Sequence, residues 1–129
     1  MHLEVIQPFK IRISSDFDHI IVPGVDGDFG IDINHTPFIT KIRPGILQLY
    51  KGNQIEKYAI HDGFVTVENN MIKIICEVVE KTNEINVKRA ASSKERAEKR
   101  LKSSADDIDF RRAEVSLKRA LVRLELGSK

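Results

Sequence analysis

The period of the hydrophobic pattern changes near residue 85, and this change constrains the fold of the 129-residue chain more than any other feature. Before it, short alternating runs of apolar and polar residues are broken by Pro and Gly, which is typical of β-strands joined by turns. After it, neither Gly nor Pro occurs until Gly127, and apolar residues recur at helical spacing. We therefore predict a β unit over residues 1–84 and a helical unit over residues 85–129.

The charge balance reverses at the same point. Residues 1–84 hold eight Lys and Arg against twelve Asp and Glu, a balance of −4. Residues 85–129 hold thirteen against seven, a balance of +6. The overall net charge of +2 therefore conceals an acidic β unit joined to a basic helical unit.

Cysteine content and hydropathy limit where such a chain can work. The single cysteine, Cys76, cannot form an internal disulfide, so we expect a reducing compartment. It lies in a strand-like apolar run and is predicted to be a small buried hydrophobic residue rather than a reactive thiol. No apolar run approaches the roughly 18 residues that span a bilayer, and the N-terminus does not resemble a signal peptide. Any association with a membrane should therefore depend on other proteins.

The β unit carries many short strand signals at near-regular spacing. Turn residues at Gly52-Asn53 and Asn69-Asn70 separate alternating runs, as in β-hairpins. The spacing predicts an antiparallel sandwich or barrel. Expected strands lie at residues 3–6, 10–14, 17–22, 46–50, 54–60, 63–68 and 71–77, with the third stopped by Pro23-Gly24.

A glycine-rich run in the middle of the β unit invites comparison with phosphate-binding loops. Gly24, Gly27 and Gly30 recur every third residue, but no Lys-Ser/Thr pair follows them. Asp26 and Asp28 would in addition repel phosphate. We interpret the glycines as residues that permit tight turns and close approach between strands.

No group of residues suited to catalysis or metal binding stands out. The four histidines are scattered without metal-ligand spacing, and no nucleophile and base can be paired. A binding or structural role is therefore favoured over an enzyme. His35, in the Pro-containing loop after Asn34, is either a turn residue or an exposed contact residue, and composition does not separate the two interpretations.

The helical unit reads as two helices joined by a short polar connection. One is expected over about 87–103 and the other over about 109–126, with N-cap candidates for the second between Ser104 and Asp107. The short connection predicts an antiparallel hairpin. The expected facing residues are Ala90, Ala91, Ala97 and Leu101 on the first helix and Phe110, Ala113, Leu117, Ala120, Leu121 and Leu124 on the second. At about 0.8 kcal/mol per buried CH₂, an alanine-rich seam is weak and could open.

Four arginines should converge across this hairpin. If the chain reverses near Asp106, Arg89 lies opposite Arg123, and Arg96 lies near Arg119. Converging guanidinium groups suit a polyphosphate or nucleotide. The alternative is a solvated basic face with local acidic partners, and the charge pattern alone favours it. Those partners would be Glu95, Glu98 and Glu114.

Several runs resemble the epsilon subunit of F-type ATP synthases, nearly from end to end. The most specific is Val22-Pro23-Gly24-x-x-Gly27-Asp28-Phe29-Gly30-Ile31, followed by His35-x-Pro37 and Pro44-Gly45, although Asn34 stands where that family often has Gly. Gly63-Phe64-Val65-x-Val67 and Arg112-Ala113-Glu114-x-x-Leu117-x-Arg119-Ala120-x-x-Arg123-Leu124 also fit. The resemblance implies an α+β fold in which an N-terminal antiparallel β-sandwich is followed by a C-terminal antiparallel αα-hairpin, in agreement with the patterns above.

The resemblance implies a non-catalytic subunit of the rotating central stalk of a proton-translocating synthase. Its β-sandwich would bind the gamma subunit and the c-subunit ring, with Asp28, Phe29 and His35 at the ring. Its hairpin would permit turnover when folded and inhibit ATP hydrolysis when extended into the alpha/beta catalytic head, whose acidic surfaces suit its positive charge. The complex would hold the chain at the cytoplasmic face of a bacterial plasma membrane or, alternatively, at the stromal side of a plastid thylakoid.

The resemblance also implies that ATP is a candidate regulatory ligand, while no cofactor is required. Some bacterial members bind ATP through an Ile/Leu-Asp-x-x-Arg-Ala motif and further arginines. The matching residues are Glu80, Ile85, Asn86, Arg89, Ala90, Arg96, Arg119 and Arg123. Asn86 replaces the Asp, so we expect ATP to bind less tightly than it would with Asp.

A different class of function is kept as the alternative. It is a stand-alone nucleotide- or nucleic-acid-binding module that uses the basic hairpin. Nucleic acid is disfavoured because residues 85–129 contain a single aromatic residue, Phe110, and their acidic and basic residues are interleaved. The alternative also leaves the acidic glycine-rich run without a role.

Overall fold

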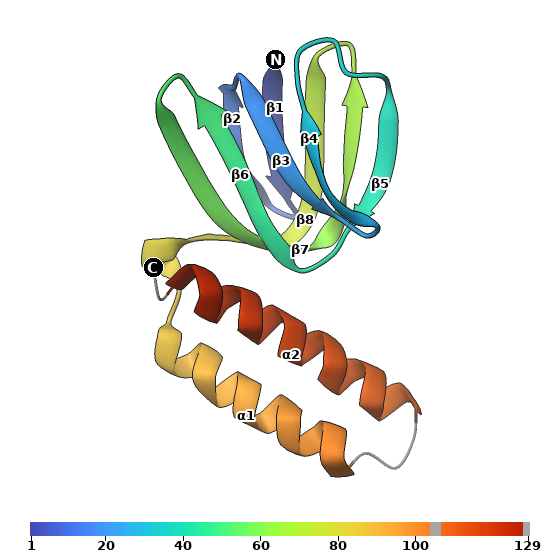
Figure 1. Cartoon of the computed structure of the whole chain (residues 1–129), viewed down its shortest axis with the longest axis vertical. Coiled ribbons are helices and arrows are strands. Elements are labelled where there is room, and N and C mark those ends of the chain that lie inside the picture. The colour runs from blue at the N-terminus through green and yellow to red at the C-terminus, as the bar shows by residue number, and fades with distance from the viewer. Residues whose placement is uncertain (104–106, 128–129) are drawn as a thin grey trace. The chain divides into compact units, whose positions relative to one another are not determined.

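The computed structural model describes residues 1–103 and 107–127, with the side chain at position 108 left out. The chain divides into two compact units, Met1–Glu80 and Lys81–Lys129. Strands make up the first unit and helices dominate the second (Figure 1).

The first unit is a β-sandwich, which confirms the predicted fold (Figure 1). Its strands are β1 (His2–Gln7), β2 (Lys10–Asp16), β3 (His19–Gly24), β4 (Gly27–Ile31), β5 (Phe38–Ile42), β6 (Gly45–Lys51), β7 (Gln54–Glu68) and β8 (Met71–Lys81). They hydrogen-bond in the order β2-β1-β8-β7-β5-β3-β4, and β6 pairs with both β3 and β7. The hairpin pairs β1–β2, β3–β4 and β6–β7 are antiparallel, whereas β1 and β8 run parallel, with Leu3 beside Ile72.

The core of the sandwich is built from alternate residues of these strands. Leu3 and Val5 of β1 are fully buried, as are Ile72 and Ile74 of the parallel strand β8. Further fully buried members are Ile20, Val22, Ile31, Leu47, Leu49, Ile60 and Val65. Each such side chain contributes about 1.5–3 kcal/mol on burial, so the alternating pattern fixes which face of each strand points inward.

One strand was predicted as two. Residues 54–60 and 63–68 form a single strand, β7, rather than two strands. Asp62 adopts a left-handed φ of 61°, which bends the strand locally. Up to Ile60, β7 pairs with β6, and from Gly63 onward it pairs with β5. A Cβ on Gly63 would overlap the carbonyl oxygen of Ile75, so close backbone approach requires glycine there.

The prediction for the middle of the β unit was also incomplete. Pro23-Gly24 do not stop the third strand, because β3 continues through both residues and pairs them with β4. Pro23 keeps its carbonyl oxygen as an acceptor, and the backbone N–H of Arg43 donates to it at 3.0 Å. Strands β4 and β5 were not predicted, since most of their residues are exposed and their sequences lack a clean alternation.

The helical unit consists of a short 3₁₀ helix, η1 (Thr82–Glu84), and two α-helices, α1 (Val87–Ser103) and α2 (Asp107–Gly127). The two α-helices pack along each other as the predicted hairpin (Figure 1). Among the described residues, none of the helices is long and apolar enough to cross a membrane. The predicted reversal near Asp106 and the N-cap candidates from Ser104 to Asp106 lie outside the described residues.

The prediction of which helix residues face each other across the hairpin is partly wrong. Ala90 and Ala97 of α1 and Ala113 and Ala120 of α2 are all at most 3% exposed. Phe110 and Leu121, in contrast, are 43% exposed. Ala91 is exposed as well, and the large side chains Leu101, Leu117 and Leu124 are only half-buried. Leu126 near the end of α2 is the one large side chain among the described residues of the two helices that is equally buried, at 2% exposed. The other buried positions hold alanine, which permits close helix approach with little apolar area.

We predict that the native thiol of Cys76 is unreactive. Its residue is 2% exposed, and burial raises the pKa of the thiol to about 11, so little thiolate exists at pH 8. An aromatic disulfide reagent should label the native chain at least about tenfold more slowly than the chain in guanidinium chloride, followed by absorbance. Equal rates in the two states would contradict the buried position.

Candidate functional site

The glycine-rich run forms the β3–β4 hairpin, which confirms that its glycines serve backbone geometry. Gly27 has a φ of 134°, a value that L side chains rarely adopt. A Cβ on Gly30 would lie 2.8 Å from Cε1 of His19, which faces it across the strand pair. The hairpin sets Phe29 opposite Val22 and Asp28 opposite Pro23. The predicted contact residues Asp28 and Phe29 thus lie on a strand, and alternation sends their side chains to opposite faces.

Asp28 is held by an arginine that sequence reasoning missed. Nη2 of Arg43 donates to Oδ1 of Asp28 at 2.6 Å, and the two side chains are 38% and 55% exposed. A pair this exposed contributes about 0–1 kcal/mol to stability. Its effect is to fix the orientation of the carboxylate and to compensate its charge. Nothing in the spacing of the two residues along the sequence signals the pair.

Phe29 and His35 meet through Phe38, a residue that the sequence did not single out. The Phe29 and Phe38 rings lie edge to face with centroids 5.3 Å apart, and the His35 ring lies 6.3 Å from Phe38. Nδ1 of His35 donates to the carbonyl oxygen of Thr36 at 2.7 Å. Phe29 itself is half-buried and packs against the hydrophobic core, so its ring lies beneath Phe38 rather than on the outside. We call Asp28, His35, Phe38 and Arg43 the loop surface.

Exposed aliphatic side chains occur in the same hairpin, loop and strand that carry the loop surface. Val25 is 53% exposed, Ile33 59% and Ile39 68%. The loop that carries His35 is held by Asn34, whose φ of 66° explains why glycine also suits this position. Its N–H donates to Oδ1 of Asn70 in the β7–β8 turn at 2.6 Å. The surface therefore combines apolar groups with an ordered loop, as protein-binding surfaces do.

A second apolar area lies at another part of the sandwich. It is a hollow of about 320 Å³, in which Gly63 leaves room beside Phe64 and Ile75. Phe64 is 48% exposed and Ile75 56%, while Phe9 in the nearby β1–β2 turn is fully exposed. The residues that line the hollow are Ile6, Gln7, Pro8, Asp62, Gly63, Phe64, Ile75, Cys76 and Glu77. We call this area the apolar hollow.

In the helical unit, Asn86 is the N-cap of α1. Its Oδ1 accepts a hydrogen bond from the backbone N–H of Arg89 at 3.0 Å, and its carbonyl oxygen accepts from Ala90 at 3.0 Å. Ala90 itself is buried and Ile85 is half-buried. This part of the predicted nucleotide motif thus has a structural role of its own.

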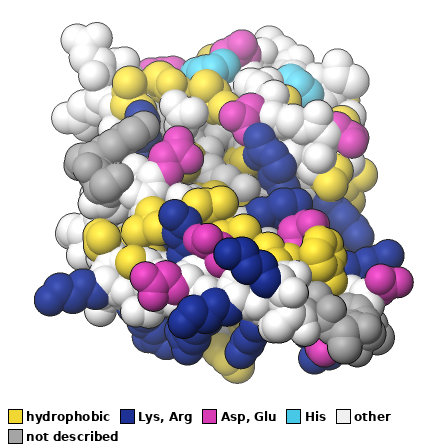
Figure 2. Space-filling model, turned by 60° about the horizontal axis from the view of Figure 1, so that its bottom comes forward, with side chains coloured by type: hydrophobic (Ala, Val, Ile, Leu, Met, Phe, Trp, Pro, Cys, Tyr) yellow, Lys and Arg dark blue, Asp and Glu magenta, His cyan; other side chains and the backbone are white. Residues whose placement is uncertain are grey.

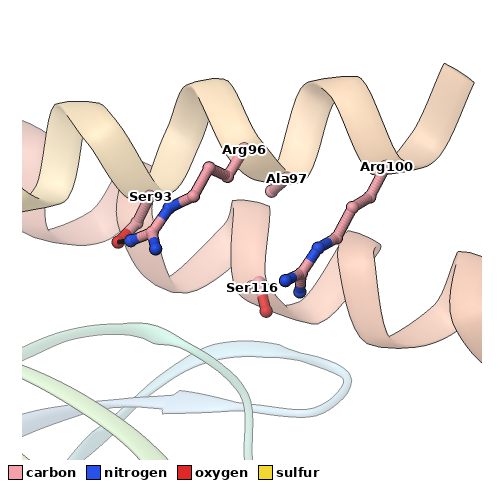
Figure 3. A pocket seen from close by; sticks show the side chains of 5 residues that line it. All are labelled: Ser93, Arg96, Ala97, Arg100 and Ser116. Carbon is pink, nitrogen blue, oxygen red and sulfur yellow. Dashed lines mark hydrogen bonds between the residues drawn. The ribbon is translucent and has the colours of Figure 1, made fainter.

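A cavity of about 190 Å³ lies between α1 and α2, lined by Ser93, Arg96, Ala97, Arg100 and Ser116. Figure 3 shows the side chains of Arg96 and Arg100 extending from α1 toward α2, where Ser116 lies. Nη2 of Arg96 donates to Oγ of Ser93 at 3.3 Å. Sequence reasoning selected Arg96 but missed Arg100, although the spacing of four residues between them places both on one helix face.

The other predicted nucleotide residues lie elsewhere. Arg89 is exposed at the start of α1, whereas Arg119 and Arg123 are half-buried on α2. Glu80 belongs to β8 in the other unit. Of the four arginines that were predicted to converge, Arg96 lines the cavity, and Arg100 lines it as well.

Charges of both signs cover the face of the helical unit that Figure 2 displays. Two local ion pairs on the helices, Lys94–Glu98 at 3.8 Å and Lys118–Glu114 at 3.7 Å, match the solvated-face interpretation in part. Neither pair involves an arginine.

Metal-ligating side chains do not cluster in the described part of the chain, and one carboxyl group of the sandwich has a shifted pKa. Within residues 1–103 and 107–127, no three His, Cys, Asp or Glu side chains gather as a metal site. Away from the loop surface, the pKa of Asp16 is lowered, chiefly because Nδ1 of His2 hydrogen-bonds to its carboxylate at 2.8 Å.

Comparison with known proteins gives matches over both units. Residues 1–82 match the family described as "ATP synthase, Delta/Epsilon chain, beta-sandwich domain", and residues 83–126 match its "long alpha-helix domain". An ATP synthase epsilon chain of Halalkalibacterium halodurans is 38% identical over all of this chain and 98% of its own length. One from Desulforamulus reducens is 36% identical over 95% of this chain and 93% of its own length.

Solved structures share the fold at lower identity. A chain of the Euglena gracilis mitochondrial ATP synthase, solved as OSCP/F1/c-ring, superposes with a TM-score of 0.85 at 22% identity, covering 98% of this chain and 80% of that one. A chain of the Tetrahymena thermophila mitochondrial central stalk and c-ring gives a TM-score of 0.62 at 17% identity, covering 98% and 92%.

We predict that replacing the Asn86 cap exposes the first turn of α1. In N86A the N–H of Arg89 loses its acceptor, which costs about 1 kcal/mol and should speed amide exchange of Arg89 about fivefold. N86D keeps a capping oxygen and serves as the matched control, with Arg89 protection retained. Hydrogen exchange followed by NMR checks this, and unchanged exchange in N86A would contradict the cap.

Proposed function

We propose a role for this chain inside an ATP synthase, because it belongs to the ATP synthase epsilon chain family. In our proposal it is a non-catalytic subunit of the rotating central stalk that couples the catalytic head to the c-ring of a proton-translocating enzyme. The observation that carries the proposal is the match of both units, in order, to the two domains of one family. A stand-alone nucleic-acid module would not require this pairing.

The two sandwich surfaces suit two protein partners. The loop surface, with Asp28 and His35, is proposed to face the c-ring, and the half-buried Phe29 would support it from within by its contact with Phe38. Its exposed Phe38 and Ile39 would supply apolar contact area, and the Asp28–Arg43 pair would supply polar contacts. The apolar hollow, beside the fully exposed Phe9, is proposed to receive the gamma subunit. A fully exposed aromatic ring next to an apolar depression is the type of feature that a protein partner covers.

The hairpin is proposed to act as the regulatory element. Apart from Leu126, the buried residues among those described in its two helices are alanines, so its seam provides little hydrophobic stabilisation and could rearrange. Its positive balance, thirteen Lys and Arg against seven Asp and Glu over residues 85–129, suits acidic surfaces of the alpha/beta head. We propose that the extended hairpin inhibits ATP hydrolysis and that the folded hairpin permits turnover.

ATP is proposed as a ligand of the folded hairpin. The candidate residues are Glu80, Ile85, Asn86, Arg89, Ala90, Arg96, Arg119 and Arg123. The cap supports the expectation that a chain with Asn at position 86 binds ATP more weakly than one with Asp. The single side-chain oxygen of Asn86 is used by Arg89 N–H, and the remaining polar atom is a donor. An Asp would keep a second oxygen free to accept from a ligand.

The complex is proposed to hold the chain at the cytoplasmic face of a bacterial plasma membrane. The two epsilon chains described above, which share 36% and 38% identity with this chain, are bacterial, and this favours a bacterial plasma membrane over a plastid thylakoid.

Removing the hairpin should separate assembly into the synthase from inhibition of ATP hydrolysis. The core cluster of the sandwich draws its members from residues 3–79, so a chain that ends after Ile85 should still fold and assemble. We expect the assembled complex to hydrolyse ATP faster than one with the full chain, measured by phosphate release at equal occupancy. Unchanged hydrolysis in the truncated complex would count against the inhibitory role.

Calorimetric titration tests the proposed ligand. ATP should release heat on binding to the full chain, and N86D should bind it about tenfold more tightly because a free carboxylate oxygen accepts a stronger hydrogen bond. The absence of heat at millimolar ATP in both proteins would end this part of the proposal.

A further inference from the structure

We propose that Asn34 and Asn70 are positioning residues, which together hold His35 in the orientation that a partner of the loop surface would meet. The backbone N–H of Asn34 donates to Oδ1 of Asn70 at 2.6 Å, and Nδ2 of Asn70 donates to Oδ1 of Asn34 at 3.1 Å. We call these two reciprocal hydrogen bonds the amide clasp. Its role in binding rests on the proposed contact between the loop surface and the c-ring.

The loop between β4 and β5 is not held in place by packing. Apart from His35, which is half-buried, residues 32–37 are all exposed. A loop without buried side chains keeps one conformation only if polar contacts and backbone geometry restrict it. The position of His35 therefore depends on the few hydrogen bonds that tie this loop to the rest of the sandwich.

A turn within the loop places His35 directly after Asn34. The backbone N–H of His35 donates to the carbonyl oxygen of Asp32 at 3.1 Å, and Asn34 has a left-handed φ of 66°. This is the arrangement of a β-turn whose third residue needs a positive φ, which Asn tolerates better than most residues. Because Asn34 adjoins His35, fixing the backbone of Asn34 also restricts that of His35.

The amide clasp joins this turn to a well-packed part of the sandwich. Asn70 lies in the β7–β8 turn, and its carbonyl oxygen accepts a hydrogen bond from the backbone N–H of His2 at 2.9 Å. The next residues of the paired strands β1 and β8 include Leu3 and Ile72, which are fully buried. The backbone of Asn70 is thus fixed by the core, and its side chain reaches the exposed loop.

A second contact holds the start of the loop. Nδ1 of His19 hydrogen-bonds to Oδ1 of Asp32 at 2.6 Å, where the chain leaves β4. This contact fixes one end of the turn, whereas the amide clasp fixes the turn at Asn34. A turn attached at one end can still pivot, and a second point of attachment prevents this. We therefore assign the orientation of His35 to the clasp.

Substitutions by glycine test the clasp, because glycine accepts the positive φ at each position. N70G removes both bonds of the clasp and permits the φ of 60° found there. N69G is the matched control, since Asn69 also has a positive φ, 50°, but its side chain takes no part in the clasp. N34G keeps the N–H that donates to Asn70 and removes only the Oδ1 acceptor, so its effects should lie between those of the other two variants.

Amide hydrogen exchange of the isolated full-length chain, followed by NMR, measures the clasp directly. We expect N70G to speed exchange at Asn34 and His35 at least about fivefold relative to N69G, because the loop loses an attachment. Unchanged methyl shifts of buried Ile72 would show that the sandwich stays folded in both variants. Equal exchange of the Asn34 amide in N70G and N69G would overturn the clasp, whatever the loop surface binds.

The positioning role is tested with the chain assembled with the gamma subunit and purified c-ring of the same synthase. N70G should weaken binding to the c-ring at least about fivefold, because a loosened loop must be ordered on binding, and N69G should change it by no more than about twofold. N70D, which restores an acceptor for the N–H of Asn34, should recover part of the loss.

The variant H35A tells failure of the clasp from failure of the contact. If H35A and N70G both weaken binding, the inference is supported. If H35A weakens binding but N70G does not, despite faster exchange in the loop, the positioning role is overturned and the proposed contact stands. If neither variant weakens binding, the proposed contact of His35 with the c-ring fails, and the positioning role is overturned with it.

Discussion

The large hydrophobic core is confined to one unit, and every other feature of this chain depends on that. Its buried members run from Leu3 to Val79 and include fully buried Leu, Ile and Val from most of the strands. The helical unit buries mainly alanines at its helix seam. Because hydrophobic stabilisation scales with apolar area, the sandwich can serve as a fixed anchor while the hairpin is held weakly. A subunit with one stable and one adaptable part can stay bound to an assembly and still change state.

The two units also differ in how their charged side chains are compensated. On the sandwich, the carboxylate of Asp28 is compensated by Arg43 within the chain, so the loop surface offers an ordered pair rather than a bare charge. On the hairpin, Arg96 and Arg100 line a cavity without a carboxylate among the described residues. The first arrangement suits a lasting protein contact and the second suits an exchangeable anion. In the proposed function, stable attachment and regulation would thus depend on different chemistries as well as on different units.

The sequence predicted those features that are encoded locally. The bounds of α1 follow from an uninterrupted helical period, and the turns at Gly52 and at Asn69-Asn70 follow from residues that accept positive φ. Features that depend on packing were missed. The bend at Asp62 joins two predicted strands into one, and the exposed strand β5 has no burial pattern to reveal it. At the candidate sites, Phe38 and Arg43 become visible only once strands distant in sequence lie side by side. Arg100 could have been found from its spacing to Arg96, but Ser116 needed the helix register.

The central claim is that a firmly folded sandwich carries a hairpin able to take two positions. The most direct measurement is a distance distribution between spin labels at exposed Glu68 of the sandwich and exposed Lys118 of α2, taken in the assembled enzyme with and without ATP. The account predicts two distance populations, with the shorter one favoured by ATP. A single distance that ATP leaves unchanged, under conditions that both permit and inhibit hydrolysis, would contradict it.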